Sequence, residues 1–527
     1  MDCCLREKER TLALALEEQE RRRELYWREF DPFLAMRLRW RASMMRHLFH
    51  ILPGEKILEI GAGDGAFTRA LVTVTQGECP VTAVVFDEAR GRSLQNKAGI
   101  CRVVRAGGFP GDLASGSFDY VVAHAMMEDR TRHAFLKELR RCLRPGGGLL
   151  LFEPNPWNPY LRLRKGLRRL LPLDWRRPEE PISLDRLRMF SVLSDIGYTH
   201  IRAQPYDFLY PPVPRRGVGL ARNLSLVLEN TPVIRNFAGS LCVWARSGDR
   251  PRQEDRTLST LFCRHKMFKQ KISFVIPCHN EESVITGLIQ GIYRFYGDYA
   301  REVIVVDDGS TDHTAEVVRE ITKSHPSVRL LRRDPPNGVG RALRTGLRAA
   351  TGEFVVLMDA DFQDILPEMR DLFEAVAEGA DVAVGSRFSR ESVLLNYPWT
   401  KIMANRLFHV LANVLVMPTW RRQWSARGKP PVHPQSVGGR GHFRDISNNL
   451  KVMRRDVVDR LVLRADDFAA NAETGLRPLL MGYDVREVPI SWINRTAEMG
   501  TSSFKLMKTG PNYVRFLNRL LKEYAKK

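Results

Sequence analysis

The chain has 527 residues, of which 44% are hydrophobic and 27% charged. This is the composition of a globular protein, and the chain is too long for one ordinary core, so we expect two domains. The formal net charge of +21 favours anionic partners: a membrane surface, a phosphate-bearing substrate or nucleic acid. Its eight cysteines show no C-x-x-C pair and no zinc-ligand spacing, which argues against structural zinc and disulfides and favours reduced thiols.

The N-terminal residues 1–30 alternate Glu and Arg over a Leu/Ala stripe. This pattern predicts a solvated helical arm and not a secretory signal, because the segment is charged throughout. No stretch has the roughly 18 apolar residues of a spanning helix, and the most apolar run, 407–417, is about half that length. We therefore expect a cytoplasmic protein without a transmembrane segment, with any membrane contact peripheral and at the inner face.

Residues 31–247 predict a first α/β domain, in which apolar strands alternate with helical stretches as in a parallel sheet. The strand at Ile57–Ile60 enters the turn Gly61-x-Gly63-x-Gly65, and the strand at 81–86 ends in Asp87. Glycines allow close approach of the backbone to a ligand, and a carboxylate at the end of the next strand can accept hydrogen bonds from a ribose. A tight turn without a ligand is the alternative.

Two later motifs, G-S-F-D at 116–119 and L-R-P-G-G at 143–147, complete a series that resembles the class I S-adenosylmethionine-dependent methyltransferases over about residues 30–245. The resemblance implies a Rossmann-like fold that binds S-adenosyl-L-methionine at Glu59, Gly61, Gly63 and Gly65, with Asp87 on the ribose. The chain departs from the family at 105–107, where relatives usually carry an acidic residue near the adenine. Candidates for a base are His124, Glu128 and Glu153, with structural roles as the alternative for each.

Residues 248–270 are polar and aperiodic, which predicts a linker, and a second α/β domain covers 271–527. Its first strand stops at Pro277 and is followed by Asn280 and Glu281. Its second strand, at 302–306, is followed by Asp307, Asp308 and Gly309. Acidic groups at these two strand ends are placed to hold the base and ribose of a nucleotide. A capped turn with surplus acids is the alternative.

The apolar strand at 354–358 ends in Asp359-Ala360-Asp361-Phe362-Gln363. On an extended chain, the i, i+2 spacing turns Asp359 and Asp361 to the same side. Two neighbouring carboxylates repel each other unless a cation lies between them, and their oxygens suit Mg²⁺ or Mn²⁺ bridging a diphosphate. Because Gln363 repeats the spacing with a neutral oxygen, the sequence predicts a metal site of Asp359, Asp361 and Gln363.

This order of motifs resembles the family 2 glycosyltransferases of the GT-A fold over about residues 271–514. Within that family it looks closest to the polyprenyl-phosphate sugar transferases of the dolichol-phosphate mannose synthase type, on the segments 385–388 (GSRF), 445–451 (DISNNLK), 483–492 and 495–505. The resemblance implies a nucleotide-sugar donor, bound at Pro277, Asn280, Glu281, Asp307, Asp308, Gly309, Ser503 and Lys505. It implies a catalytic set of Asp359, Asp361, Arg387 and Arg495, with Arg387 on a phosphate and Arg495 over the donor diphosphate.

The implied acceptor is a polyprenyl phosphate at the membrane surface, with Lys401 and Asn405 on its phosphate or, alternatively, in structural roles. A lipid phosphate is already ionised at neutral pH, whereas a sugar hydroxyl needs a general base, for which Glu473 is the one candidate. We thus expect a bifunctional enzyme that combines metal-dependent, inverting sugar transfer with methyl transfer. The alternatives are a glycan or protein hydroxyl as sugar acceptor, and a catalytically inactive first domain that serves as a binding module. Nucleic acid is not expected, because the basic stretches are broken by Pro and Gly and no binding motif accompanies them.

Overall fold

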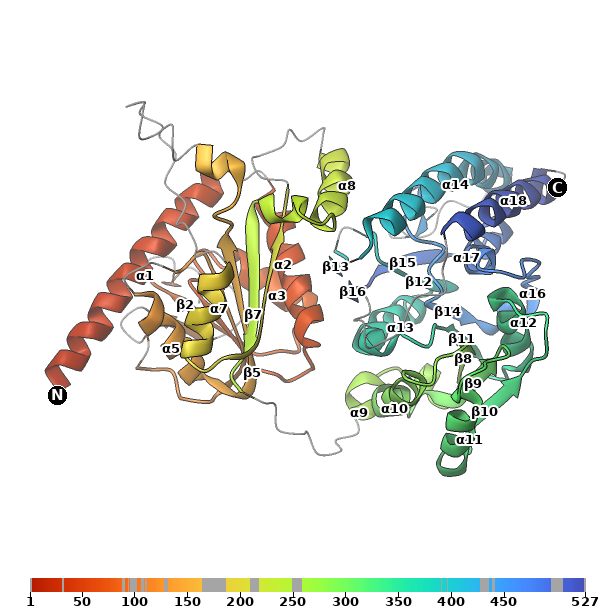
Figure 1. Cartoon of the computed structure of the whole chain (residues 1–527), viewed down its shortest axis with the longest axis horizontal. Helices are drawn as coiled ribbons and strands as arrows, with labels where there is room; N and C mark the ends of the chain where they lie inside the picture. Colours follow the sequence, from red (N-terminus) through yellow and green to blue (C-terminus); the bar gives the residue numbers. More distant parts are fainter. Residues whose placement is uncertain are drawn as a thin grey trace. The chain divides into compact units, whose positions relative to one another are not determined.

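The computed structural model describes residues 2–30, 33–87, 91–92, 94, 102–105, 109, 111–127, 131–163, 186–208, 218–248, 258–389, 391–395, 397–426, 436–437, 441–493 and 506–525. The chain divides into two compact units, Met1–Glu254 and Asp255–Lys527 (Figure 1). The division falls inside the segment that the sequence predicts as a linker. Each unit is built on its own seven-stranded sheet, which confirms the predicted two-domain α/β architecture.

The sheet of the first unit has the strand order β3-β2-β1-β4-β5-β7-β6. Strands β1 to β5 run parallel, and β7 lies antiparallel between β5 and β6. Every residue of β1 and of β4 is buried, which explains why these strands are apolar runs and not alternating patterns. The strands are β1 (Ile57–Ile60), β2 (Val81–Val85), β3 (Arg102–Arg105), β4 (Phe118–His124), β5 (Leu143–Pro154), β6 (Thr199–Tyr206) and β7 (Ser240–Arg246).

The helices of the first unit include α1, the N-terminal segment that the sequence predicts as a solvated arm. It forms a helix, but the solvated part of the expectation is wrong: Leu12 and Leu16 are buried in the core cluster that holds Leu58 and Val84. The sequence alone could not show which face of α1 is covered. The helices are α1 (Asp2–Phe30), α2 (Leu34–Phe49), α3 (Ala66–Val74), α5 (Arg132–Cys142), α7 (Arg186–Asp195), α8 (Val218–Glu229) and the 3-10 turn η3 (Ile234–Phe237).

The main sheet of the second unit has the order β10-β9-β8-β11-β14-β12-β15. Strand β14 is antiparallel to β11 and β12, and the other pairs are parallel. The strands are β8 (Ile272–Cys278), β9 (Ala300–Asp307), β10 (Val328–Arg332), β11 (Phe354–Leu357), β12 (Val382–Ser386), β14 (Lys451–Arg454) and β15 (Val485–Pro489). A separate two-stranded sheet pairs β13 (Leu394–Leu395) with β16 (Trp492–Ile493).

Part of the predicted linker is folded. The helix α9 (Ser259–Phe262) and the turn η4 (Lys266–Phe268) pack on the second unit: the ring of Phe262 lies 5.0 Å from that of Phe295, and the ring of Phe268 lies 4.7 Å from that of Phe354. The other helices of this unit are α10 (Ile285–Tyr296), α11 (Thr314–Ser324), α12 (Val339–Ala349), η5 (Gln363–Glu368), α13 (Met369–Ala377), α14 (Trp399–Ala426), α16 (Arg455–Arg460), α17 (Ala469–Met481) and α18 (Leu506–Ala525).

Helix α14 has one buried and one exposed apolar face. Ile402, Ala412 and Val416 are buried, whereas Leu407 and Val414 are exposed. By length and composition, its portion Trp399–Arg422 could cross a membrane. Of the 18-residue apolar stretch within this portion, 28% is buried in the fold. One such helix is weak evidence for a span. Polar residues interrupt the helix, so its sequence contains no unbroken apolar run of spanning length.

Candidate functional site

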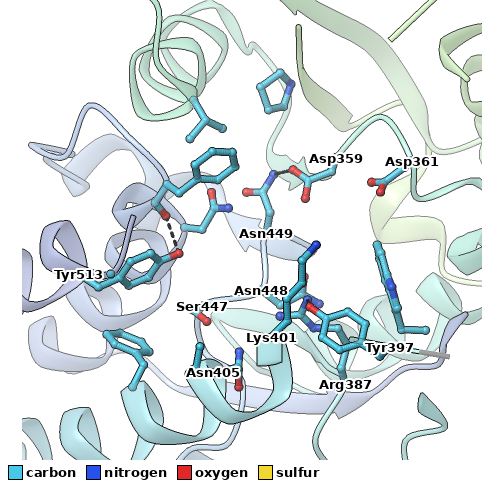
Figure 2. A pocket seen from close by; sticks show the side chains of 18 of the residues that line it. Asp359, Asp361, Arg387, Tyr397, Lys401, Asn405, Ser447, Asn448, Asn449 and Tyr513 are labelled. Carbon is cyan, nitrogen blue, oxygen red and sulfur yellow. Dashed lines mark hydrogen bonds between the residues drawn. The ribbon is translucent and has the colours of Figure 1, made fainter. Parts of the chain in front are cut away.

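A cavity of about 1170 Å³ opens where β8, β9 and β11 end in the second unit (Figure 2). Its inner wall consists of the loops that follow these strands and of the segment 447–449. Its outer wall consists of the helices α14 and α18, which meet where the ring of Phe408 lies 4.9 Å from that of Tyr513. A cleft at the carboxyl ends of the strands is the usual place for a ligand in an α/β sheet.

Three of the predicted nucleotide-binding residues line this cavity: Pro277, Glu281 and Asp308. The carboxylate of Asp308 accepts hydrogen bonds from the guanidinium of Arg333 and from the backbone amide of Gly338. The negative charge of Asp308 is therefore fixed at the wall of the cavity before any ligand arrives.

The other described members of that set shape the loops instead. Asp307 is fully buried, and its Oδ1 accepts the amide of Ser310 at 3.0 Å, which closes the turn at Gly309 with φ +72°. The Oδ1 of Asn280 accepts the amide of Thr311 at 2.8 Å. None of Asn280, Asp307 and Gly309 lines the cavity. Their polar groups are used to hold two loops in register with each other.

Asp359 and Asp361 face the cavity and are each half-buried. Asn449 donates a hydrogen bond from Nδ2 to Asp359 Oδ1 at 2.7 Å. Burial and the neighbouring Asp361 carboxylate raise the pKa of Asp359, which is the electrostatic condition that a bound cation relieves. The Oδ1 atom of Asn449 is buried, and no described group donates to it. This set of oxygen atoms fits Mg²⁺ or Mn²⁺.

Gln363 is not brought to this pair. The chain turns directly after the strand, with the amide of Phe362 donating to the carbonyl of Asp359 at 3.2 Å, so the extended spacing that the sequence argument assumed ends there. Gln363 begins η5, and its side-chain amide fills the place that a Cβ atom on Gly287 of α10 would take. Within the described ranges, no group of three or more His, Cys, Asp or Glu side chains could hold a metal ion.

Arg387 follows β12 and is locked to Asp445. Its Nε donates to Asp445 Oδ2 at 2.7 Å, its Nη2 to Oδ1 at 2.9 Å, and its Nη1 to the hydroxyl of Tyr397 at 3.3 Å. Burial opposes the charged form of both partners, yet their pairing keeps the pKa of Arg387 above and that of Asp445 below the ordinary value. A guanidinium has five N–H donors, so Arg387 retains donors for a ligand in the cavity.

Lys401 and Asn405, which the sequence places on the acceptor phosphate, make different contacts on α14. Lys401 lines the cavity, as Figure 2 shows, and provides a cationic group on its outer wall. Asn405 also lines the cavity, but its Nδ2 donates to Asp445 Oδ1 at 3.1 Å and so supports the pair that Asp445 forms with Arg387. This hydrogen bond is consistent with the structural role that the sequence left open as the alternative for Asn405.

Two buried charged residues hold the floor of the site. Lys451 donates from Nζ to the carbonyls of Asn448 and Asn471, the latter at 2.9 Å, and burial lowers the pKa of Lys451 to about 7. Glu473 is fully buried and accepts the amide of Ala465 at 2.8 Å and Nε of Arg477 at 2.6 Å. With its carboxylate used in this way, Glu473 is not placed to act as a general base.

Sequence reasoning assigned no roles to Asp445, Asn449 or Lys451, although their motif at 445–451 was part of the resemblance. The clustering of Asp, Asn and Lys within one short segment was the available clue, but their partners Arg387, Asp359 and Asn471 lie in distant parts of the chain. The predicted donor-side residues Arg495, Ser503 and Lys505 lie outside the described residues.

In the first unit, the predicted cofactor residues lie at the carboxyl ends of β1 and β2. Gly61, Gly63 and Gly65 have φ of +73°, +55° and +76°, which glycine adopts without strain. Glu59 is buried and accepts the hydroxyl of Thr68 at 2.6 Å, and burial raises the pKa of Glu59 to about 7.

This cradle is not open, because side chains of α1 lie in it: Glu20 accepts the amide of Gly63 at 3.0 Å, and Arg23 donates to the carbonyl of Gly61 at 2.6 Å. With α1 in this position, the backbone groups of Gly61 and Gly63 that would face a cofactor already have partners.

The candidate bases of the first unit are enclosed as well. Arg41 Nη1 lies 3.2 Å from His124 Nδ1, the ring of His124 stacks on that of Phe152 at 5.0 Å, and burial lowers the pKa of His124. Glu153 is also buried, and burial raises its pKa to about 8. Glu128 lies outside the described residues.

Two family models match the chain: Glycosyl transferase family 2 over residues 273–461 and Methyltransferase domain over residues 57–147. The dolichol-phosphate mannosyltransferase of Pyrococcus furiosus is 26% identical over 252 residues, which are 48% of this chain and 64% of that protein. The polyprenol monophosphomannose synthase of Mycolicibacterium smegmatis is 27% identical over 241 residues, 44% of this chain and 80% of that protein. The match thus spans less than two thirds of the Pyrococcus protein.

Among solved structures, glucosyl-3-phosphoglycerate synthase from Mycobacterium tuberculosis in complex with UDP is similar at 19% identity and a TM-score of 0.34, covering 52% of this chain and 86% of that one. A SAM-dependent methyltransferase from Thermotoga maritima, a possible histamine N-methyltransferase, is similar at 16% identity and a TM-score of 0.30, covering 43% of this chain and 97% of that one.

Proposed function

The chain carries a glycosyltransferase family 2 domain and a methyltransferase domain, and from this premise we propose that its second unit transfers a sugar from a nucleotide-sugar to a polyprenyl phosphate. The observation that carries the proposal is the two-sided cavity. One side offers the carboxylates of Asp308, Asp359 and Asp361, and the other is the apolar face of α14, with Lys401 beside it. A donor with a diphosphate and an acceptor with an apolar tail would meet between them.

The acceptor side has the chemistry of an isoprenoid site. Trp399, Met403, Leu407 and Leu411 lie at intervals of four residues on one face of α14, and all four are exposed and line the cavity. Val414 extends this face beyond the cavity and is exposed too. Soluble surfaces rarely leave such a contiguous apolar stripe uncovered, whereas a lipid chain or bilayer would cover it. The two relatives described above are named a dolichol-phosphate mannosyltransferase and a polyprenol monophosphomannose synthase.

The donor side would hold the nucleotide-sugar and a divalent metal ion. We propose Asp359 and Asp361 as metal ligands, with Asn449 orienting Asp359 through its hydrogen bond. When bound, the metal would stabilise the negative charge of the leaving nucleoside diphosphate. Arg495, Ser503 and Lys505 are proposed to contact that diphosphate, as the resemblance implies.

The reaction we propose needs no general base. An oxygen of the acceptor phosphate, ionised at neutral pH, forms the bond to the anomeric carbon while the bond to the diphosphate breaks, and the electron pair leaves with the diphosphate. Attack from the opposite face inverts the anomeric centre. Lys401 and the remaining donors of Arg387 would hold the acceptor phosphate on that face. The engagement of Glu473 with Ala465 and Arg477 supports an acceptor that is already ionised.

The test is to incubate the full chain with Mn²⁺ and labelled sugar nucleotides, together with either a long-chain polyprenyl phosphate or a glycan acceptor. Butanol-extractable label that forms only with the lipid supports the proposal. Label that forms only on the glycan overturns it in favour of a hydroxyl acceptor. Lys401→Ala should raise KM for the lipid and leave KM for the nucleotide-sugar unchanged, since Lys401 lies on the acceptor side. For the first unit, we propose S-adenosyl-L-methionine as cofactor; its methyl acceptor is not identified.

A further inference from the structure

We propose that helix α1 is a built-in competitor of the cofactor: it occupies the cleft of the first unit that S-adenosyl-L-methionine would enter, and it must leave that cleft before the cofactor binds. The inference rests on the proposed function of the first unit, in which the turn at 61–65 and Asp87 form the cofactor site. Figure 1 shows α1 (red) running along the side of the first unit.

Glu20 makes the central contact. Its Oε1 accepts the amide of Gly63 at 3.0 Å, and its Oε2 accepts the amides of Phe86 at 3.0 Å and of Asp87 at 3.2 Å. These amides belong to the two segments that follow β1 and β2, between which the ribose of a nucleoside cofactor would lie. Glu20 is 1% exposed. One carboxylate thus bridges both walls of the cleft and takes the space and the donors that the cofactor would need.

Arg23 fills the neighbouring part of the cleft. Its Nη2 donates to the carbonyl of Gly61 at 2.6 Å, its Nη1 donates to the carbonyl of His124 at 3.0 Å, and its guanidinium lies 4.4 Å from the ring centre of Trp27. The positive charge of Arg23 also acts on the buried carboxylate of Glu59. S-adenosyl-L-methionine carries positive charge on its sulfonium and ammonium groups, so Arg23 supplies to the cleft the charge that the cofactor would bring.

The close approach that the glycines permit is used by α1 itself. A Cβ atom on Gly63 would collide with the carboxylate of Glu24, and one on Gly61 would collide with the side chain of Met126 and also approach Nη1 of Arg23. Glycine at these positions leaves space for a ligand. Here that space already contains side chains of the helix, so helix and cofactor exclude each other.

The contacts of α1 are of a kind that can be released. Among its described side chains, Leu12, Leu16 and Tyr26 are the buried apolar ones, whereas Leu14 and Leu25 are exposed. Its other buried side chains are Gln19 and the charged Glu20, Arg23 and Glu24. Desolvation of these three charged groups offsets much of their mutual attraction. A helix held in this way can be displaced by a ligand that satisfies the same amides and carbonyls.

If α1 were a lid, loosening it would change the affinity for the cofactor in the opposite direction from that expected for a competitor. A lid that closes over bound cofactor adds contacts to it, so loosening the lid weakens binding. A competitor lowers the apparent affinity by the fraction of molecules in which it is docked, so loosening it strengthens binding. The direct hydrogen bonds from the amides of Gly63 and Asp87 to Glu20 favour the competitor, because they leave no room for a cofactor between α1 and the cleft.

The experiment measures binding of S-adenosyl-L-methionine to the full chain by calorimetry. The test variant is Glu20→Gln with Arg23→Gln, which removes one negative and one positive charge. The matched control is Glu18→Gln with Arg22→Gln, an exposed ion pair of 2.6 Å on the same helix. We expect the test variant to bind about 10- to 100-fold more tightly than the unmodified chain and the control to bind equally. In the unmodified chain, added cofactor should accelerate hydrogen exchange of the amides at 16–27.

Equal or weaker binding by the test variant, together with slower exchange of α1 on addition of cofactor to the unmodified chain, overturns the proposal; α1 is then a lid, and the cofactor assignment stands. Absence of binding by every variant, although exchange shows α1 released in the test variant, overturns the cofactor assignment together with the inference. If the test variant fails to fold, the direction of the exchange change in the unmodified chain decides alone.

Discussion

The exposed apolar face of α14 gives the sharpest test of the lipid acceptor, through the double variant Leu407→Ser with Val414→Ser. Leu407 is 71% exposed and Val414 65% exposed. Full burial of such a side chain is worth about 1.5–3 kcal/mol, so covering these exposed fractions with lipid contributes about 1–2 kcal/mol for each residue. Each substitution should therefore weaken partition into vesicles by about 5- to 30-fold, and the double variant by the product of the two.

The assay is sedimentation with vesicles that contain polyprenyl phosphate, combined with steady-state kinetics on a long-chain and a short-chain acceptor. We expect kcat/KM to fall for the long-chain acceptor, because its tail loses contact with α14, and to change little for the short-chain one. The KM for the nucleotide-sugar should stay constant, since neither residue is on the donor side of the cavity.

The matched control is Val462→Ser. Val462 is 59% exposed, belongs to the same unit and does not line the cavity. It should leave both partition and kinetics unchanged. Equal losses with Val462→Ser and with the α14 variant, or equal losses for the long-chain and short-chain acceptors, would refute the assignment of this face to a lipid chain.

Three further predictions concern the buried charges of the second unit. Asp359→Asn should reduce sugar transfer at least about 100-fold, since a metal contributes several kcal/mol, and a chelator should then have little further effect on the residual rate. Asp445→Asn should lower the free energy of unfolding by about 3–5 kcal/mol, because it leaves Arg387 buried without its partner; a loss below about 1 kcal/mol in urea titrations contradicts this. Burial lowers the pKa of Lys451 from 10.5 to about 7, so the unfolded chain binds more protons between these values and stability rises with pH there. The stability of the unmodified chain relative to Lys451→Met should accordingly increase between pH 7 and about pH 10, as measured by urea unfolding.

What could be predicted from the sequence were the features that depend on neighbours along the chain. The strands β8 and β11, which end at Cys278 and Leu357, are short apolar runs followed by polar turns, and burial on both faces makes such runs recognisable. The positions of Asp308 and Asp361 at the cavity follow, because the ends of parallel strands meet at one edge of a sheet.

What could not be predicted depends on which partners the side chains take and where the chain turns, and neither follows from residue spacing. Asn280 and Asp307 are acceptors of the same general kind as Asp308, yet they bond to the amides of nearby turns and only Asp308 faces the cavity. Gln363 is not part of the metal site because the chain turns between Asp359 and Phe362. The helix at 2–30 could be recognised from its periodicity, but nothing in that periodicity indicates that Glu20 meets the amide of Gly63.

In both units buried charged side chains have polar partners, but these contacts leave the ligand site open in the second unit and fill it in the first. In the second unit, Asp445 holds Arg387 at the wall of the cavity and leaves the cavity itself open. In the first unit, Glu20 and Arg23 satisfy the polar groups of the cleft by entering it. Binding in the second unit therefore needs no prior rearrangement of α14 or α18, whereas binding of the cofactor must wait for α1. Association of S-adenosyl-L-methionine should accordingly approach a limiting rate at high cofactor concentration, set by the departure of the helix, and Glu20→Gln with Arg23→Gln should raise that limit.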